Sequence, residues 1–179
     1  MKILALDLGT FTGFAYGEIN SPVAHLVAGT LELATPKEIT RMGKDRRSRT
    51  DDWRIGRFYK WLLKMGKLFH PDVVIWEDVR FSSYTFQTQL WASFRTTVWI
   101  AMHQIGEPLP YLECVDVQTL KIFATGHGGA TKVMMATALY KQHPELKEKC
   151  LGDDAVDAIF LFKWAEKNLS RLKPNEPTS

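Results

Sequence analysis

The first eight residues constrain this chain more than any other stretch, because an acid interrupts an apolar strand. Residues 1–8 read MKILALDL, and Asp7 is the carboxylate in this run. An unpaired buried carboxylate costs several kcal/mol or becomes neutral. Such an acid is therefore either a cap for the following turn or a functional group. Gly9 and Gly13 favour a tight turn into a second strand over residues 12–16.

Composition places the chain among ordinary globular proteins. At 179 residues, with 45% apolar and 24% charged side chains, we expect one domain with a sizeable core, spanning residues 1–166 before a polar, frayed tail at 167–179. No apolar run approaches the ~20 residues that cross a bilayer. Asp7 interrupts any signal-peptide pattern, so we expect a cytoplasmic protein without membrane contact. Cys114 and Cys150 lack the spacing of a zinc site or a disulfide framework.

Hydrophobic periodicity predicts an alternation of strands and helices. A third strand over residues 23–33 completes an antiparallel meander. Helices are predicted over 52–69 and 85–105, where apolar side chains recur every three or four positions. Between them, residues 73–76 form an unalternating apolar run, typical of a parallel strand covered on both faces. The remaining expected elements are a strand over 109–115, a short helix capped by Asp116, a helix from Thr131 to about Gln142, and a last helix with Asp153 as its cap.

Four acids fall where these elements begin or end. Asp7 lies in the first strand, Glu77 ends the fourth, and Asp154 and Asp157 share one face of the last helix. In an open sheet the two strands can be neighbours with this helix across them. Carboxylates gathered in this way cannot all stay ionised without cations, and oxygen ligands select Mg²⁺ or Mn²⁺. Two such ions about 4 Å apart can clamp a phosphodiester during hydrolysis. Asp153 remains an alternative to Asp154 as a ligand.

A basic segment between Lys37 and Arg57 is dense enough to bind a phosphate backbone, although a solvated loop would explain it equally well. Pro36 and the polar run over 43–49 predict a loop rather than a regular element. The DNA-binding candidates within it are Arg41, Lys44, Arg46, Arg47 and Arg49.

The predicted helix over 85–105 carries more apolar surface than one stripe needs. Trp91, Trp99 and Met102 lie beside its main stripe. This pattern indicates either a partner surface or a helix that is buried on two sides.

The motifs together carry a family resemblance. The sequence resembles the RuvC-type Holliday-junction resolvases of the RNase H-like superfamily over nearly its whole length. The matching stretches are residues 3–10 (ILALDLGT), 12–15 (TGFA), 74–77 (VIWE) and 154–158 (DAVDA), together with Lys121 and Lys132, which are eleven residues apart. The resemblance implies an α/β, RNase H-like fold: a mixed five-stranded sheet, three antiparallel strands followed by parallel ones, with helices on both faces.

The resemblance also implies an activity. Family members are homodimers that bind four-way DNA junctions and nick two strands symmetrically, using Mg²⁺, in DNA recombination and repair. By resemblance, Asp7, Glu77, Asp154 and Asp157 hold two Mg²⁺ ions, for which Mn²⁺ can substitute. Lys121 and Lys132 face the scissile phosphate, and the helix over 85–105 forms the dimer interface.

Two departures from the family pattern affect DNA binding. The family places an aromatic residue three positions after the second acid, whereas here Arg80 stands at that position and Phe81 follows it. Both are candidates for contact with DNA. The long basic segment is typical of a bacteriophage or mobile-element relative, which would act on flaps or other branches in a bacterial or phage-infected host cytoplasm.

Three other function classes are open at this stage. Residues 7–10 (DLGT) also resemble the phosphate-binding opening of sugar kinases and actin-like ATPases, but those proteins need two such domains and over twice this length. An RNA-processing nuclease of the same superfamily would carry a similar set of acids. A non-catalytic nucleic-acid-binding relative would keep the fold, but the presence of all four acids argues against it.

Overall fold

A single mixed sheet of five strands forms the centre of the molecule, in the order β3–β2–β1–β4–β5. The computed structural model describes residues 1–44, 52–78, 85–149 and 151–168. The strands are β1 (Lys2–Asp7), β2 (Phe11–Glu18), β3 (Val27–Glu32), β4 (Val73–Asp78) and β5 (Tyr111–Asp116). β1 to β3 pair antiparallel, whereas β4 pairs parallel with both β1 and β5. The predicted fold class is confirmed.

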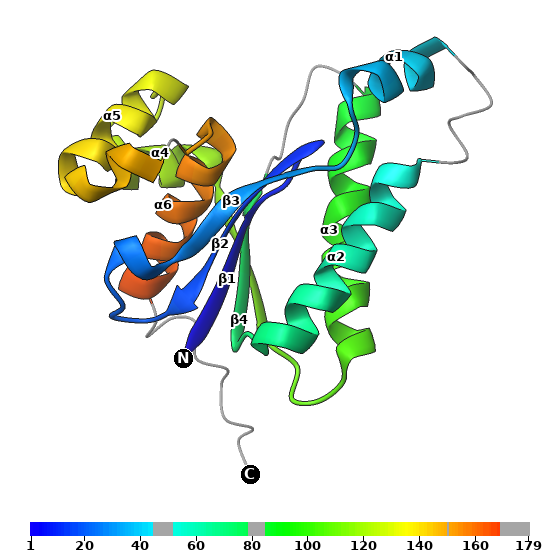
Figure 1. Cartoon of the computed structure of the whole chain (residues 1–179), viewed down its shortest axis with the longest axis horizontal. Coiled ribbons are helices and arrows are strands. Elements are labelled where there is room, and N and C mark those ends of the chain that lie inside the picture. Colours follow the sequence, from blue (N-terminus) through cyan, green and yellow to red (C-terminus); the bar gives the residue numbers. More distant parts are fainter. Residues whose placement is uncertain (45–51, 79–84, 150, 169–179) are drawn as a thin grey trace.

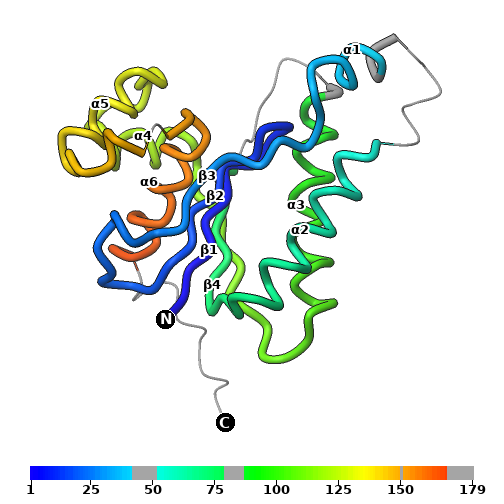
Figure 2. The backbone as a smooth tube through the Cα atoms, in the orientation of Figure 1, coloured from blue at the N-terminus to red at the C-terminus, as the bar shows by residue number. Residues whose placement is uncertain are grey.

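Helices cover both faces of this sheet (Figure 1). On one face lie α2 (Trp53–Phe69) and α3 (Thr85–Ile105), and on the other lie α4 (Val117–Thr125), α5 (Lys132–Gln142) and α6 (Asp153–Lys167). The backbone trace in Figure 2 shows the sheet between these two layers. Within the described ranges, no helix is both long and apolar enough to cross a bilayer.

The pleat of the inner strands divides the core in two. Ile3 and Ala5 of β1 pack with α6, while Leu4 and Leu6 pack with α2 and α3. Side chains alternate between the two faces of a strand, so a strand covered by helices on both sides needs apolar residues at every position. This explains the unalternating run of residues 73–76, and it directs the next odd-numbered side chain of β1, Asp7, towards the α6 face.

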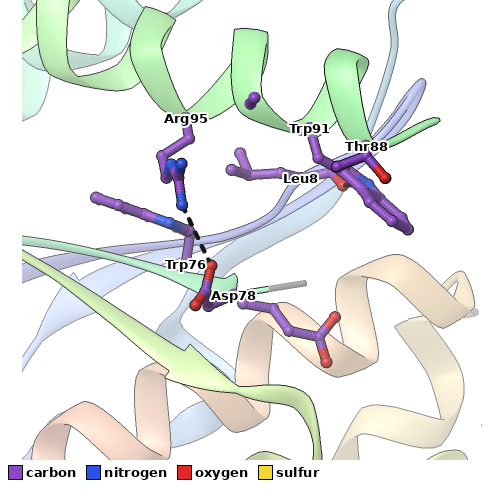
Figure 3. Close-up of a pocket in the computed structure, with 8 residues that line it drawn as sticks. Leu8, Trp76, Asp78, Thr88, Trp91 and Arg95 are labelled. Atoms are coloured by element: carbon purple, nitrogen blue, oxygen red, sulfur yellow. Dashed lines mark hydrogen bonds and ion pairs between the residues drawn. The ribbon is translucent and has the colours of Figure 1, made fainter. Parts of the chain in front are cut away.

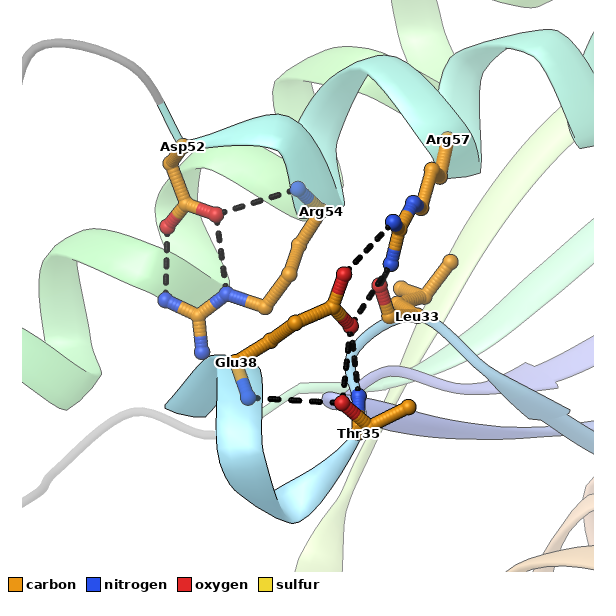
Figure 4. A network of polar contacts seen from close by, with 6 residues as sticks. All are labelled: Leu33, Thr35, Glu38, Asp52, Arg54 and Arg57. Carbon is orange, nitrogen blue, oxygen red and sulfur yellow. Dashed lines mark hydrogen bonds and ion pairs between the residues drawn. The ribbon is translucent and has the colours of Figure 1, made fainter. Parts of the chain in front are cut away.

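A helix, α1 (Pro36–Lys44), occupies part of the basic segment that was predicted to be a loop. That prediction was wrong for residues 36–44. Thr35 accepts a hydrogen bond from the Glu38 amide, and the Glu38 carboxylate accepts one from the Thr35 amide. These reciprocal bonds form a capping box, with Pro36 in the first helical position, where its missing N–H costs nothing. Figure 4 shows this helix start.

Several predicted boundaries also shift. The predicted third strand begins with a short 3₁₀ helix, η1 (Val23–His25), so β3 is shorter than expected. A second 3₁₀ helix, η3 (Pro144–Lys149), precedes α6. The cap of α6 is Gly152 rather than Asp153, which is the first helical residue. In contrast, Asp52, Asp116 and Thr131 cap α2, α4 and α5 through their side chains. Residues 169–179 of the predicted tail lie outside the described residues.

Candidate active site

Two of the predicted acids lie on neighbouring parallel strands. Leu6 of β1 is in register with Trp76 of β4, so the next residues, Asp7 and Glu77, lie side by side where these strands end. Both belong to the set of positions that faces α6. The parallel pairing of β1 with β4, which joins segments about seventy residues apart, therefore creates the first half of the cluster.

The start of α6 supplies the other two acids. Asp7 is in register with Gly13 on β2, and a Cβ at position 13 would overlap the backbone carbonyl of Asp154. The first turn of α6 therefore touches β2 directly beside Asp7. Asp157 follows one turn later on the same helix face. We call Asp7, Glu77, Asp154 and Asp157 the acid cluster.

The pKa values of the acid cluster reflect this crowding. Burial raises the pKa of Asp7 well above its ordinary value, and the neighbouring charges raise it further, with Glu77 contributing most. Burial likewise raises the pKa of Glu77 to about 7, helped by the charge of Asp157. The pKa of Asp157 rises to about 6, again chiefly through burial. Three acids shifted in the same direction form a site that favours the binding of cations.

Two lysines border the acid cluster from α4 and α5. Lys132 Nζ lies 3.6 Å from Asp154 Oδ1 and 3.9 Å from Asp153 Oδ2. Partial burial lowers the pKa of Lys132, but the charges of Asp154 and Asp153 outweigh that effect and raise it overall. Lys121 lowers the pKa values of Glu77 and Asp157 through its charge. The structure thus brings both predicted lysines to the predicted acids.

Asp153 and Asp154 differ in their relation to the cluster. The Asp154 side chain is 25% exposed and its charge acts on Asp7, whereas the Asp153 side chain is 56% exposed and points to Lys132 alone among the described ion pairs. This difference favours Asp154 as the member that faces the shared space.

The donor set fits hard divalent cations. All four members of the acid cluster offer carboxylate oxygens, which Mg²⁺ and Mn²⁺ prefer. In the part of the chain that the structure describes, no three acidic, histidine or cysteine side chains converge on one point. The acids therefore flank a common space without a preformed ligand shell, and they would hold an ion after their side chains turn towards it.

The structure describes only some of the predicted DNA-binding residues. Arg41 is exposed on α1, and Lys44 is the last residue of that helix. Arg46, Arg47, Arg49, Arg80 and Phe81 lie outside the described residues. Two other arginines at the end of the basic segment are engaged within the protein. Arg57 forms a bidentate pair with Glu38, and buried Arg54 binds Asp52 (Figure 4). Arg54 also donates a hydrogen bond to the Thr10 hydroxyl.

The additional apolar residues of α3 have different environments. The Trp91 indole donates a hydrogen bond to the Leu8 carbonyl, and Met102 is buried in the core. Trp99 and Ile100 are 53% and 46% exposed. Of the three side chains beside the main stripe, only Trp99 is largely exposed, and with Ile100 it forms the exposed apolar surface of the described part of α3.

Sequence reasoning missed two features near the acid cluster. The first is the contact between Gly13 and α6. The sequence analysis assigns Gly13 to a tight turn, although a glycine inside a strand is a known signal of close backbone approach. A cavity of about 280 Å³ also lies beside Glu77, with walls from Trp76, Asp78 and α3. No local pattern could reveal this cavity, because it forms between segments far apart in the sequence.

Comparison with known proteins adds a fold assignment. No protein-family model matches the chain, and no curated protein matches it in sequence. The structure of RuvC from Thermus thermophilus superposes with a TM-score of 0.65 at 19% identity, covering 98% of this chain and all of that one (100%). The chain has the RuvC fold. A T. thermophilus RuvC structure in complex with Holliday junction substrate gives a TM-score of 0.63 at 19% identity, covering 90% of both chains.

A eukaryotic structure shares the same fold. Ydc2, the yeast mitochondrial Holliday junction resolvase, gives a TM-score of 0.61 at 11% identity and covers 95% of this chain and 79% of its own. The resemblance of the sequence to RuvC-type proteins is thus confirmed at the level of the fold, with almost the whole chain included.

Proposed function

We propose that this protein is a metal-dependent endonuclease that cuts four-way or other branched DNA. The observation that carries the proposal is the acid cluster: three separate elements deliver four carboxylates to one end of the parallel strands, where burial raises the pKa values of Asp7, Glu77 and Asp157. The fold shared with T. thermophilus RuvC, one structure of which holds a Holliday junction substrate, supports DNA as the polymer.

Asp7, Glu77, Asp154 and Asp157 would hold two Mg²⁺ ions. Bound there, the ions would supply charge neutralisation at the phosphate and a water of lowered pKa. The protein's own contribution is positional. β1 and β4 fix Asp7 and Glu77 on a rigid edge, and the contact at Gly13 sets the distance of the α6 acids from them.

Lys121 and Lys132 would bind the scissile phosphate. Both lie close enough to the acid cluster to alter its pKa values, and the Lys132 side chain is 62% exposed and can turn to a ligand. Ammonium groups bind phosphate as point charges. Arg41, Lys44 and the basic residues that follow them would contact the DNA backbone further out, which makes binding fall as salt rises.

A homodimer would place two such sites on one junction and produce paired nicks. Exposed Trp99 and Ile100 on α3 support this assembly, since they provide an apolar surface on the helix that the family uses for dimerisation.

The test is a cleavage assay on end-labelled substrates: a four-way junction, a linear duplex, a 5′ flap and a structured RNA. We expect paired nicks near the crossover of the junction in Mg²⁺, no cleavage in EDTA, and none by Asp157→Asn in Mg²⁺. Cleavage of RNA alone would replace the proposal by an RNA-processing nuclease. Binding without cleavage in either Mg²⁺ or Mn²⁺ would leave a non-catalytic nucleic-acid-binding protein.

A further inference from the structure

The cavity beside Glu77 lies on the opposite face of the sheet from the acid cluster. It is lined by Leu8, by Trp76, Glu77 and Asp78 of β4, and by Thr88, Trp91, Ala92 and Arg95 of α3 (Figure 3). Because side chains alternate along β4, Trp76 and Asp78 point towards α3 while Glu77 points towards α6. Three consecutive residues of one strand therefore connect the cavity to the acid cluster.

The size and lining of the cavity fit a flat aromatic group. Its volume of about 280 Å³ is many times the roughly 10–15 Å³ that one water molecule requires. Trp76 and Trp91 offer indole rings, and the Trp76 indole nitrogen, in a side chain that is 7% exposed, has no hydrogen-bond partner among the described residues. The Trp91 ring is held in place by its bond to the Leu8 carbonyl, at 3.1 Å.

The polar side chains of the cavity could tell one base from another. Arg95 Nη1 lies 3.5 Å from Asp78 Oδ1, and the two side chains are 55% and 15% exposed. Together they add a donor and an acceptor to a cavity whose lining is about equally polar and apolar. Nucleobases that leave the stack are read in this way, by stacking on aromatic side chains and by hydrogen bonds to their edges.

We propose that this cavity binds one unpaired nucleobase, the one attached next to the phosphate that the acid cluster cuts. The inference rests on the proposed function and adds a cause of sequence preference to it. A phosphate held beside Glu77 places the neighbouring sugar at the end of β4, from which the base can turn towards α3. At a branch point the pairing of that base is already weakened, which lowers the cost of extrusion.

The test measures binding rather than cleavage. The Asp7→Asn protein is titrated with junctions in which the nucleotide next to the mapped cut site is A, C, G, T or abasic. Ala92 is exposed and lines the cavity, so Ala92→Leu is added to fill it, and Ala92→Ser is the matched control that leaves the cavity open. We expect the abasic junction to bind at least about fivefold more weakly than the best base in the open-cavity proteins, and no weaker in Ala92→Leu.

A second variant tests base discrimination. Arg95→Ala should reduce the spread of affinities among the four bases while the abasic junction stays weaker than all of them. Equal affinities for all five junctions in the open-cavity proteins, or the same abasic effect in Ala92→Leu as in Ala92→Ser, would overturn the inference and leave the proposed function intact. Failure to bind any branched DNA would instead overturn the proposed function, and this inference with it.

Discussion

A Cβ at position 13 would occupy space that the backbone of Asp154 fills. Position 13 therefore has no room for a side chain. Gly13 also lies in register with Asp7, so this constraint acts directly on the acid cluster. Neither backbone can withdraw without moving its whole element. The single hydrogen at Gly13 thus sets how closely the α6 acids approach the strand acids.

Gly13→Ala is expected to separate the two halves of the acid cluster. Overpacking of this kind typically costs about 1–3 kcal/mol, and we expect the chemical denaturation midpoint to fall together with the Mg²⁺-dependent gain in stability. Gly56→Ala is the control, since nothing lies within 4 Å of a Cβ there. Because Gly56 is exposed, that change should stabilise α2 by about 0.5–1 kcal/mol. A Gly13→Ala protein with wild-type Mg²⁺ response would contradict the role of this contact.

The raised pKa of Glu77 makes stability depend on pH. Because its pKa is about 7 in the folded protein against an ordinary 4.5, the folded state binds more protons in that window, and its stability falls as pH rises through it. In a chelating buffer, Glu77→Gln should therefore be more stable than wild type at pH 8, on the order of 2 kcal/mol, and about equal to it at pH 4. Urea denaturation at the two pH values measures this difference. A difference in stability that does not vary with pH would refute the raised pKa assigned to Glu77.

Among the elements, α1 is the helix for which the sequence analysis predicts a loop, although the sequence contains a helix start. The residues Thr35-Pro36-Lys37-Glu38 satisfy the capping-box pattern with proline in the first helical position. The sequence analysis predicts that Pro36 breaks regular structure, but proline breaks a helix only in its interior. The pairing of Glu38 with Arg57 could not be predicted in the same way, because nineteen residues separate them and only the tertiary structure joins α1 to α2.

Thr35→Ala is expected to loosen α1 locally. Without the Thr35 hydroxyl, the first turn loses the acceptor for the Glu38 amide, so amide hydrogen exchange over residues 36–44 should accelerate. Thr40→Ala is a matched control on the same helix, where the hydroxyl bonds only to the Pro36 carbonyl; it should leave exchange unchanged or slow it. Equal acceleration in both variants would show that the capping box does not hold this helix.

At the scale of the whole molecule, the sheet was predictable and the site was predictable in part. The alternation of short apolar runs with amphipathic helices fixes the order of elements, and the acids stand at their ends. Which face each acid takes follows from the pleat, as Asp7 shows. The cavity between β4 and α3 did not follow, because it depends on how Trp76 and Trp91 pack across more than a dozen residues of sequence separation.

For the whole molecule, the exposed apolar surface of α3 formed by Trp99 and Ile100 predicts a dimer. Ile100→Asp should convert a dimer to a monomer in size-exclusion chromatography with light scattering, because a charge in an apolar interface is left without a partner. Ile122→Asp is the control: Ile122 is 55% exposed on α4, across the sheet from α3. A dimer that survives Ile100→Asp would place the interface elsewhere.

Asp7 is the central residue of the proposed metal-dependent site that cuts branched DNA. The measurement is the single-turnover rate of four-way junction cleavage in Mg²⁺ by Asp7→Asn and by Asp153→Asn, with junction affinity recorded for both. Asp7→Asn should lose about a hundredfold or more in rate while still binding the junction. Asp153→Asn, which removes an exposed neighbouring charge, should stay within a few-fold of wild type. Cleavage by Asp7→Asn at the wild-type rate would contradict the account.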